Sequence, residues 1–220
     1  MSNILTIAYG TEGTTDKRFL YSIIKRTFDE VAFQCETEID VYDPVYLQPQ
    51  PKRNFVDDSK TLAKMSFDAG IHVLCLHSDA DAANDNDVLN HKIKPALEAV
   101  EAAEDNLCKN LVPVVPVRMT EAWILADKEL LISEIGTKMT INELGLNVNP
   151  ETIADPKQLV IDALRIAQEH ISNRRNKLEI SELYQPLGQK LSLAKLSELP
   201  SYLKFREAVE NAFKNLNYLH

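Results

Sequence analysis

The fold of this chain is decided by Gly70-Ile-His-Val-Leu-Cys-Leu-His77-Ser-Asp79-Ala-Asp81, an apolar run that opens with a glycine and ends in two carboxylates one residue apart. Uninterrupted apolar positions are typical of a strand that is buried on both faces of a parallel sheet. In open α/β sheets, ligands bind outside the carboxyl ends of the strands. The stretch therefore predicts a central strand whose end, at Asp79 and Asp81, is suited to a hard divalent cation.

Three more runs predict strands: the apolar run at residues 4–10, the alternating run at 37–43 and the apolar run at 111–117. The two prolines of the last run indicate an edge position or a strand with breaks. Helical patterns separate the four runs, so we expect an α/β fold with a mainly parallel, Rossmann-like sheet flanked by helices. Helical patterns dominate from residue 136 onward. We expect an α/β core at residues 1–135 and a C-terminal helical extension packed on it at residues 136–220.

Prolines, glycines and capping residues predict where elements begin and end. The expectations are irregular structure from Pro44 to about Asn54, one long helix from the caps at 84–87 to about Asp105, a helix that begins at Asp155-Pro156, a chain break at Pro186-Leu-Gly188 and a last helix from Pro200.

The turn after the first strand carries a carboxylate, Glu12, between Gly10 and Gly13. It does not match a P-loop, because Asp16 precedes Lys17 where that motif needs glycine. The third glycine of the dinucleotide fingerprint is absent as well. The turn is therefore suited to presenting a carboxylate rather than to wrapping a phosphate.

Composition limits the function classes. The formal net charge of −9 argues against nucleic-acid binding by bulk electrostatics alone, since phosphate contacts need clustered Lys and Arg. No apolar stretch approaches the roughly 20 residues of a membrane helix, and no signal peptide is expected, so we predict a cytoplasmic protein without membrane contact. The three cysteines, Cys35, Cys75 and Cys108, lack zinc-site spacing and are interpreted as buried thiols.

Several motifs together resemble a known family. The motif Ala8-Tyr9-Gly10-Thr11-Glu12-Gly13-x-x-Asp16, followed by a strand that ends in Asp79-x-Asp81, resembles the TOPRIM domain of topoisomerases, bacterial primases and overcoming-lysogenization-defect (OLD) nucleases. The runs 117–127, 155–157 and 199–205 are similar to a narrower TOPRIM-like family of unknown function, found beside ABC-type ATPases in bacterial defence loci. The resemblance implies a TOPRIM fold, an ATPase partner and a nucleic-acid substrate.

The candidate site contains oxygen ligands only, which favours Mg²⁺ or Mn²⁺ over Zn²⁺. We expect Asp79 and Asp81 to hold the metal, with Glu12 as a further ligand or, as the resemblance implies, a general acid or base. Asp16 matches an acidic position of the nuclease branch and is a candidate for a second metal site or a helix first-turn residue. Two less certain candidates are Glu121, for site support or an ion pair, and Lys157, for clamping the transition state.

Other residues have competing interpretations. His77 is expected to be a core or hydrogen-bonded histidine rather than part of the site, and Trp123 a core residue rather than a base-stacking platform. The basic cluster at residues 173–177 is a solvated helix end or a nucleic-acid backbone contact.

The sequence leaves three functions open. The first is a Mg²⁺-dependent nuclease that acts on DNA or RNA under the control of an ATPase. The second is a phosphatase-type phosphoryl-transfer enzyme with Asp79 as nucleophile, although such enzymes carry Asp-x-Asp on their first strand. The third is a metal-binding regulatory or assembly subunit of an ATPase complex. A calcium loop is disfavoured because Asn90 stands where a bidentate Glu is needed. A homo-oligomer is compatible with all three.

Overall fold

The computed structural model describes residues 3–13, 15–48, 54–169 and 177–219. Its main sheet has the strand order β4-β2-β5-β6, and each neighbouring pair is parallel. The strands are β2 (Ile7–Gly10), β4 (Val45–Tyr46), β5 (Val73–His77) and β6 (Leu111–Val114). A second parallel pair joins β1 (Asn3–Leu5) to β3 (Ile39–Val41). The expected α/β class with a mainly parallel sheet is confirmed.

The sequence explains the places of β5 and β6. Every residue of β5 is buried, as the continuous apolar run predicts. β6 contains Pro113, which cannot donate to a ladder, and it lies at the edge of the sheet, one of the two alternatives expected.

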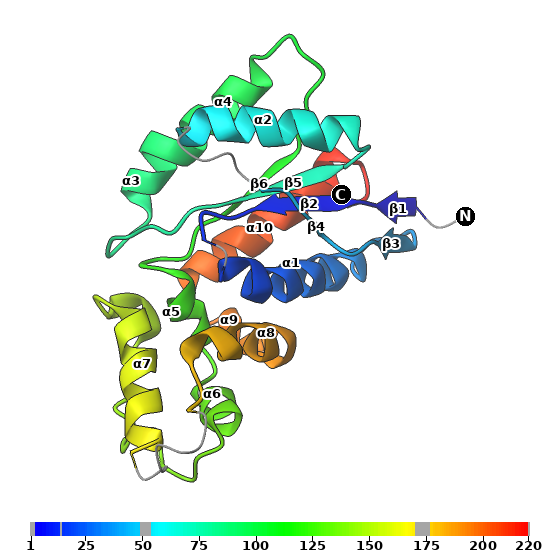
Figure 1. Cartoon of the computed structure of the whole chain (residues 1–220). Helices are drawn as coiled ribbons and strands as arrows, with labels where there is room; N and C mark the ends of the chain where they lie inside the picture. The colour runs from blue at the N-terminus through cyan, green and yellow to red at the C-terminus, as the bar shows by residue number, and fades with distance from the viewer. Residues whose placement is uncertain (1–2, 14, 49–53, 170–176, 220) are drawn as a thin grey trace.

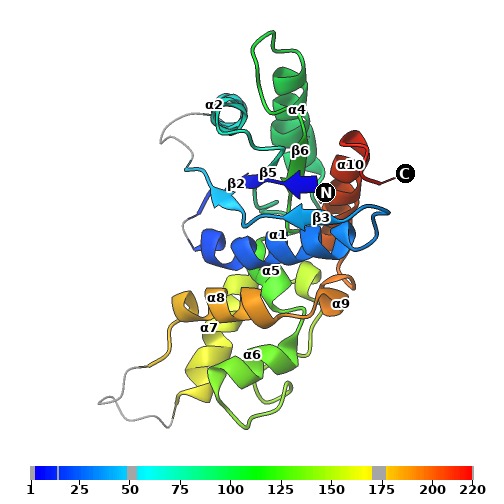
Figure 2. The same ribbon diagram turned by 90° about the vertical axis from the view of Figure 1, so that its right-hand side faces the viewer.

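Helices cover both faces of the sheet. In Figures 1 and 2, α2 (Phe55–Asp68) and α4 (Lys94–Glu101) lie on one face, while α1 (Asp16–Ala32) and α10 (Pro200–Asn215) lie on the other. The last helix of the chain therefore returns to the sheet and packs against β6 and α1. No helix of the described residues is long and apolar enough to cross a membrane.

A further group of helices lies beyond α1, away from the sheet (Figure 1). They are α5 (Thr120–Ile124), α6 (Lys128–Ile135), the 3-10 turn η2 (Pro150–Thr152), α7 (Pro156–Ala167), α8 (Ile180–Lys190) and α9 (Leu193–Leu196). As predicted, α7 begins at Asp155-Pro156, where the Asp155 carboxylate accepts from the Gln158 N–H.

The predicted break at Pro186-Leu-Gly188 is wrong, because α8 continues through both residues. Proline inside a helix costs about 3 kcal/mol, so packing must offset it. Gly188 allows that packing: a β-carbon there would lie 2.6 Å from the Phe19 carbonyl oxygen of α1. The close approach buries Leu183 and Leu187 against the core.

Two other boundaries differ from the sequence prediction. Residues 44–54 are not irregular throughout, because β4 forms directly after Pro44 and pairs with β2. The helix predicted to reach Asp105 ends at Glu101 and has three segments: α3 (Asn86–Val88), the π-helical turn η1 (Leu89–Ile93) and α4. Pro95 follows this turn and lacks the N–H that a regular helix would use, which accounts for the change of pitch.

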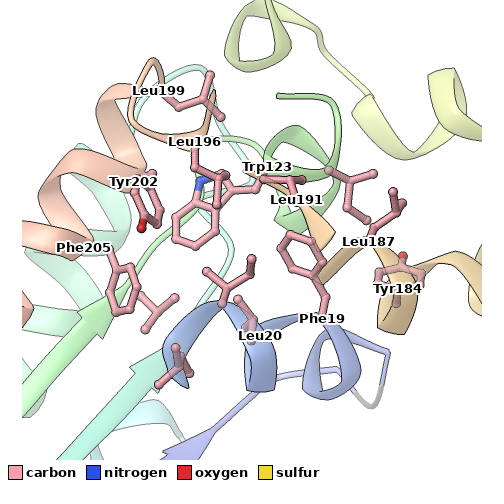
Figure 3. Close-up of a cluster of buried hydrophobic side chains, with 14 of the residues drawn as sticks. Phe19, Leu20, Trp123, Tyr184, Leu187, Leu191, Leu196, Leu199, Tyr202 and Phe205 are labelled. Atoms are coloured by element: carbon pink, nitrogen blue, oxygen red, sulfur yellow. The ribbon is translucent and has the colours of Figure 1, made fainter. Parts of the chain in front are cut away.

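A buried cluster joins the sheet to the helices beyond α1. Trp123 is fully buried, and its indole N–H donates to Ser201 Oγ at 2.7 Å. Figure 3 shows Trp123 between Tyr202 and Phe205 of α10 on one side and Phe19 of α1 on the other. The interpretation of Trp123 as a core residue is confirmed.

Candidate functional site

The candidate site lies where β2, β5 and β6 end side by side. Glu12 follows β2, Asp79 and Asp81 follow β5, and Glu121 lies in the first turn of α5, the helix that follows β6. The two loops after β5 and β6 continue to hydrogen-bond: Ala80 N–H donates to the Pro116 carbonyl at 3.1 Å and Asp81 N–H to that of Arg118 at 2.8 Å. Parallel topology thus brings residues far apart in sequence to one edge.

The loop backbone is strained at this edge. Asp81 and Arg118 have φ angles of 52° and 65°, in the left-handed region that non-glycine residues rarely occupy. Such residues persist only where the surroundings fix them, and they cluster at functional sites. In addition, Arg118 Nε is buried without a hydrogen-bond partner among the described residues.

Thr120 and His77 hold the Asp79 carboxylate in place. Its Oδ1 accepts from Thr120 N–H at 2.9 Å and lies 3.3 Å from both Thr120 Oγ1 and His77 Nε2. Burial alone would lower the pKa of His77, but the hydrogen bond and charge of Asp79, with the charges of Asp16 and Glu12, raise it above its ordinary value. His77 is therefore a buried, hydrogen-bonded histidine, as predicted, and it also contacts the site.

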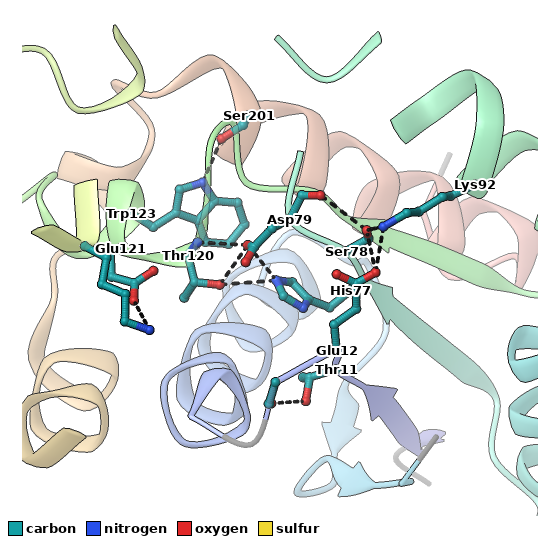
Figure 4. A network of polar contacts seen from close by, with 12 residues as sticks. Thr11, Glu12, His77, Ser78, Asp79, Lys92, Thr120, Glu121, Trp123 and Ser201 are labelled. Atoms are coloured by element: carbon teal, nitrogen blue, oxygen red, sulfur yellow. Dashed lines mark hydrogen bonds and ion pairs between the residues drawn. The ribbon is translucent and has the colours of Figure 1, made fainter. Parts of the chain in front are cut away.

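Glu12 forms a separate group with two residues that the sequence analysis did not select. Its Oε1 accepts from Ser78 Oγ at 3.0 Å and from Lys92 Nζ at 2.8 Å, and Lys92 also donates to Ser78 Oγ at 3.0 Å. Figure 4 shows Glu12, Ser78 and Lys92 converging beside Asp79. The Glu12 carboxylate thus has a positive partner from within the chain.

Asp16 and Glu121 form the buried side of the site. Glu121 accepts a short hydrogen bond from Tyr184 OH and lies 3.5 Å from Lys157 Nζ, measured from Oε1. Burial raises the pKa of Asp16; the charge of His77 opposes the rise, Asp79 and Glu121 add to it, and Lys157 opposes it. Asp16 also lies against Gly13, where a β-carbon would collide with its carboxylate. Helices α1, α5, α7 and α8 meet here.

Asp81 is exposed, and its side chain makes no hydrogen bond or ion pair within the described part of the chain. Partial burial and then the charges of Asp79 and Glu12 raise its pKa, while Lys92 opposes the rise. Asp81 lies two residues after Asp79, in the loop that follows β5. Among the described carboxylates of this edge, Asp81 is therefore available to bind a cation without first losing a hydrogen bond or an ion pair.

All the predicted site residues thus lie along one edge, but in distinct groups: Glu12 with Lys92, Asp79 with His77 and Thr120, and Glu121 with Tyr184 and Lys157. In the described ranges, no three His, Cys, Asp or Glu side chains are arranged as a ready-made metal site. Of the basic cluster at 173–177, residues 173–176 lie outside the described residues.

Four residues of the site were not predicted from the sequence: Ser78, Lys92, Thr120 and Tyr184. Thr120 and Ser78 adjoin predicted site residues, which is a usable signal. Lys92 and Tyr184 are distant from every acidic motif, and only the fold brings them to the site.

Comparison with known proteins adds no relative: neither a family model nor a curated protein nor a solved structure matches this chain.

Proposed function

We propose that this protein is a Mg²⁺- or Mn²⁺-dependent phosphodiesterase that cleaves DNA or RNA. The observation that carries the proposal is that Glu12 follows β2 while Asp79 and Asp81 follow β5, the adjacent parallel strand, so three carboxylates lie at one edge of the sheet. Burial and the charge of Asp79 raise the pKa values of both Asp16 and Asp81. The hydrogen bond and charge of Asp79, with the charges of Asp16 and Glu12, raise the pKa of His77 against the effect of its burial. Carboxylates gathered in this way favour a hard cation, which in turn attracts phosphate.

The available donors suit Mg²⁺. This ion is usually held by one or two carboxylates, with waters and substrate phosphate oxygens completing its coordination. Asp81 has a free side chain, and Asp79 has one oxygen, Oδ2, outside its hydrogen bonds to Thr120. These two residues would hold the cation. Bound there, it would neutralise a phosphate and lower the pKa of a coordinated water.

The residues of the chain supply the remaining chemistry. Thr120 and His77 fix the orientation of Asp79. Glu12 would serve as a general acid or base, the role that the TOPRIM resemblance implies. Lys157 compensates the buried Glu121 and has a half-exposed side chain, so it is available to a transition-state phosphate near Asp16.

The same resemblance suggests the biological setting. The TOPRIM topology, the relation to OLD nucleases and the ABC-type ATPase partner are part of the proposal, as is a role as effector of an anti-phage defence system. The net charge of −9 is consistent with a nuclease that depends on a partner for much of its nucleic-acid affinity.

A second candidate is a metal-binding regulatory or assembly subunit without catalysis. The Glu12–Lys92 ion pair favours it, because part of the acidic cluster is neutralised without any ligand. A phosphatase is less well supported, since the Asp79 oxygen Oδ1 is already engaged by Thr120.

The test is cleavage of DNA, RNA and tRNA by the pure protein in Mg²⁺ or Mn²⁺, with and without the ABC-type ATPase partner that the proposal implies. We expect cleavage, and a loss of about 10²–10⁴-fold in kcat for Glu12→Gln if this residue transfers a proton. Asp105→Asn, an exposed carboxylate in the loop before the amino end of β6, is the matched control and should cleave normally. Absence of cleavage in every setting, with metal still bound, would favour the regulatory subunit.

A further inference from the structure

The group formed by Glu12, Ser78 and Lys92 decides between two roles for Glu12. Ser78 is fully buried, so its hydroxyl is a fixed support rather than a mobile surface group. Lys92 Nζ lies 2.8 Å from Glu12 Oε1 and 3.0 Å from Ser78 Oγ, and its side chain is 36% exposed. The three residues come from the turn after β2, the end of β5 and the π-helical turn.

The π-helical turn places Lys92 in this group. Lys94 N–H donates to the Leu89 carbonyl, five residues back, so the turn is one residue wider than in an α-helix. Such turns are rare and frequently mark functional sites. The ring of Phe55, at the start of α2, lies 6.0 Å from Lys92 Nζ and limits its freedom further.

The contacts of Glu12 conflict with metal ligation through the same oxygen. Oε1 already accepts two hydrogen bonds, one of them from an ammonium group. A divalent cation bound to this oxygen would lie a few ångströms from that ammonium and be repelled by it. Asp81 meets no such obstacle, since its carboxylate has no hydrogen bond or ion pair among the described residues.

We propose that Lys92 is a positioning residue that reserves Glu12 for proton transfer and leaves the cation to Asp79 and Asp81. The inference rests on the phosphodiesterase function proposed above. In hydrolysis, the water oxygen forms a bond to phosphorus while the bond to the leaving oxygen breaks. Glu12 takes one proton from the water, the leaving oxygen takes a proton from solvent, and Glu12 then returns its proton to solvent.

The experiment compares Mn²⁺ affinity with kinetics. Calorimetric titration of Mn²⁺ into the full chain is carried out for the parent protein, Glu12→Gln, Lys92→Met and Asp81→Asn. We expect Glu12→Gln to bind Mn²⁺ within about threefold of the parent and Lys92→Met to bind it at least as tightly as the parent, because Lys92→Met removes a repelling charge. Asp81→Asn should bind at least about tenfold more weakly, the scale on which metal-site substitutions act. Circular dichroism confirms that each variant is folded.

Kinetics on a cleaved oligonucleotide provide the second readout. Lys92→Met should lower kcat at least about tenfold with little change in KM, because it disturbs a group that acts in the transition state. Lys92→Arg should recover part of kcat, since it restores the positive partner. Lys94→Met, which removes an exposed lysine of the same helix, should change neither quantity.

The outcomes separate the inference from the function. If Glu12→Gln weakens Mn²⁺ binding as much as Asp81→Asn does, Glu12 is a ligand, and the inference fails while the nuclease proposal stands. Unchanged kcat in Lys92→Met likewise overturns the inference alone. If the parent protein neither binds Mn²⁺ nor cleaves, both fail. The Glu12→Gln titration decides the ligand question even if Lys92→Met does not fold.

Discussion

The buried pair of Tyr184 and Glu121 gives a prediction whose size can be worked out from the structure. The Glu121 side chain is 4% exposed and accepts from Tyr184 OH, while Lys157 is 3.5 Å away with a half-exposed side chain. Tyr184→Phe keeps the ring and removes one hydrogen bond to a charged acceptor, which is worth about 1.5–3 kcal/mol. Lys157 still compensates part of the Glu121 charge. We therefore expect the free energy of unfolding to fall by about 2 kcal/mol, a value in the lower half of that range.

Urea unfolding followed by circular dichroism measures this loss, and Tm should fall by about 4–8 °C. The same substitution in a Glu121→Gln background should cost only about 1 kcal/mol, because a neutral acceptor makes a weaker bond. Tyr42→Phe, on an exposed tyrosine, is the control and should stay within about 0.5 kcal/mol of the parent. Equal losses in both backgrounds would refute the reasoning, since they would mean that Tyr184 does not interact with a charged Glu121.

Three further predictions concern packing and thiol chemistry. Gly188→Ala should lower the free energy of unfolding by about 1–3 kcal/mol despite the higher helix propensity of alanine, because the new β-carbon would overlap the backbone of α1. Gln189→Ala, at an exposed position of the same helix, should not lower it, and urea unfolding of both variants measures the difference. Ser201→Ala should cost about 1–3 kcal/mol, because it leaves a buried indole N–H unpaired, whereas a loss below about 0.5 kcal/mol in the same assay would contradict that hydrogen bond. Burial raises the pKa of Cys108 to about 11, so iodoacetamide at mildly alkaline pH should modify the less buried Cys35 first. Peptide mass mapping measures the order of modification, and equal labelling of both cysteines in the folded protein would contradict this prediction.

The sequence was sufficient for the parallel sheet and for the acidic edge. A continuously apolar strand can be buried only between two helical layers, and the strand ends of such a sheet meet at one edge. Glu12 and Asp79 therefore lie where the pattern predicts. Trp123 was likewise predictable, since a single large apolar residue on a short helix is best buried.

The sequence was not sufficient to predict helix boundaries and site residues that depend on packing between distant segments. Pro186 and Gly188 have the composition of a chain break, yet the close contact with α1 keeps them helical. Lys92 could not be selected from sequence, because its place at the site depends on the pitch of a π-helical turn. Its ion pair with Glu12 is the observation on which we propose proton transfer, rather than metal ligation, for that carboxylate.

The most direct test of the account is an anomalous difference map from crystals of the protein grown in Mn²⁺. The account predicts a Mn²⁺ peak about 2.1 Å from carboxylate oxygens of Asp79 and Asp81, with the Glu12–Lys92 ion pair intact beside it. A map without a peak between these aspartates, or with Mn²⁺ bound only elsewhere, would contradict the claim that this edge of the sheet is a metal-dependent hydrolytic site.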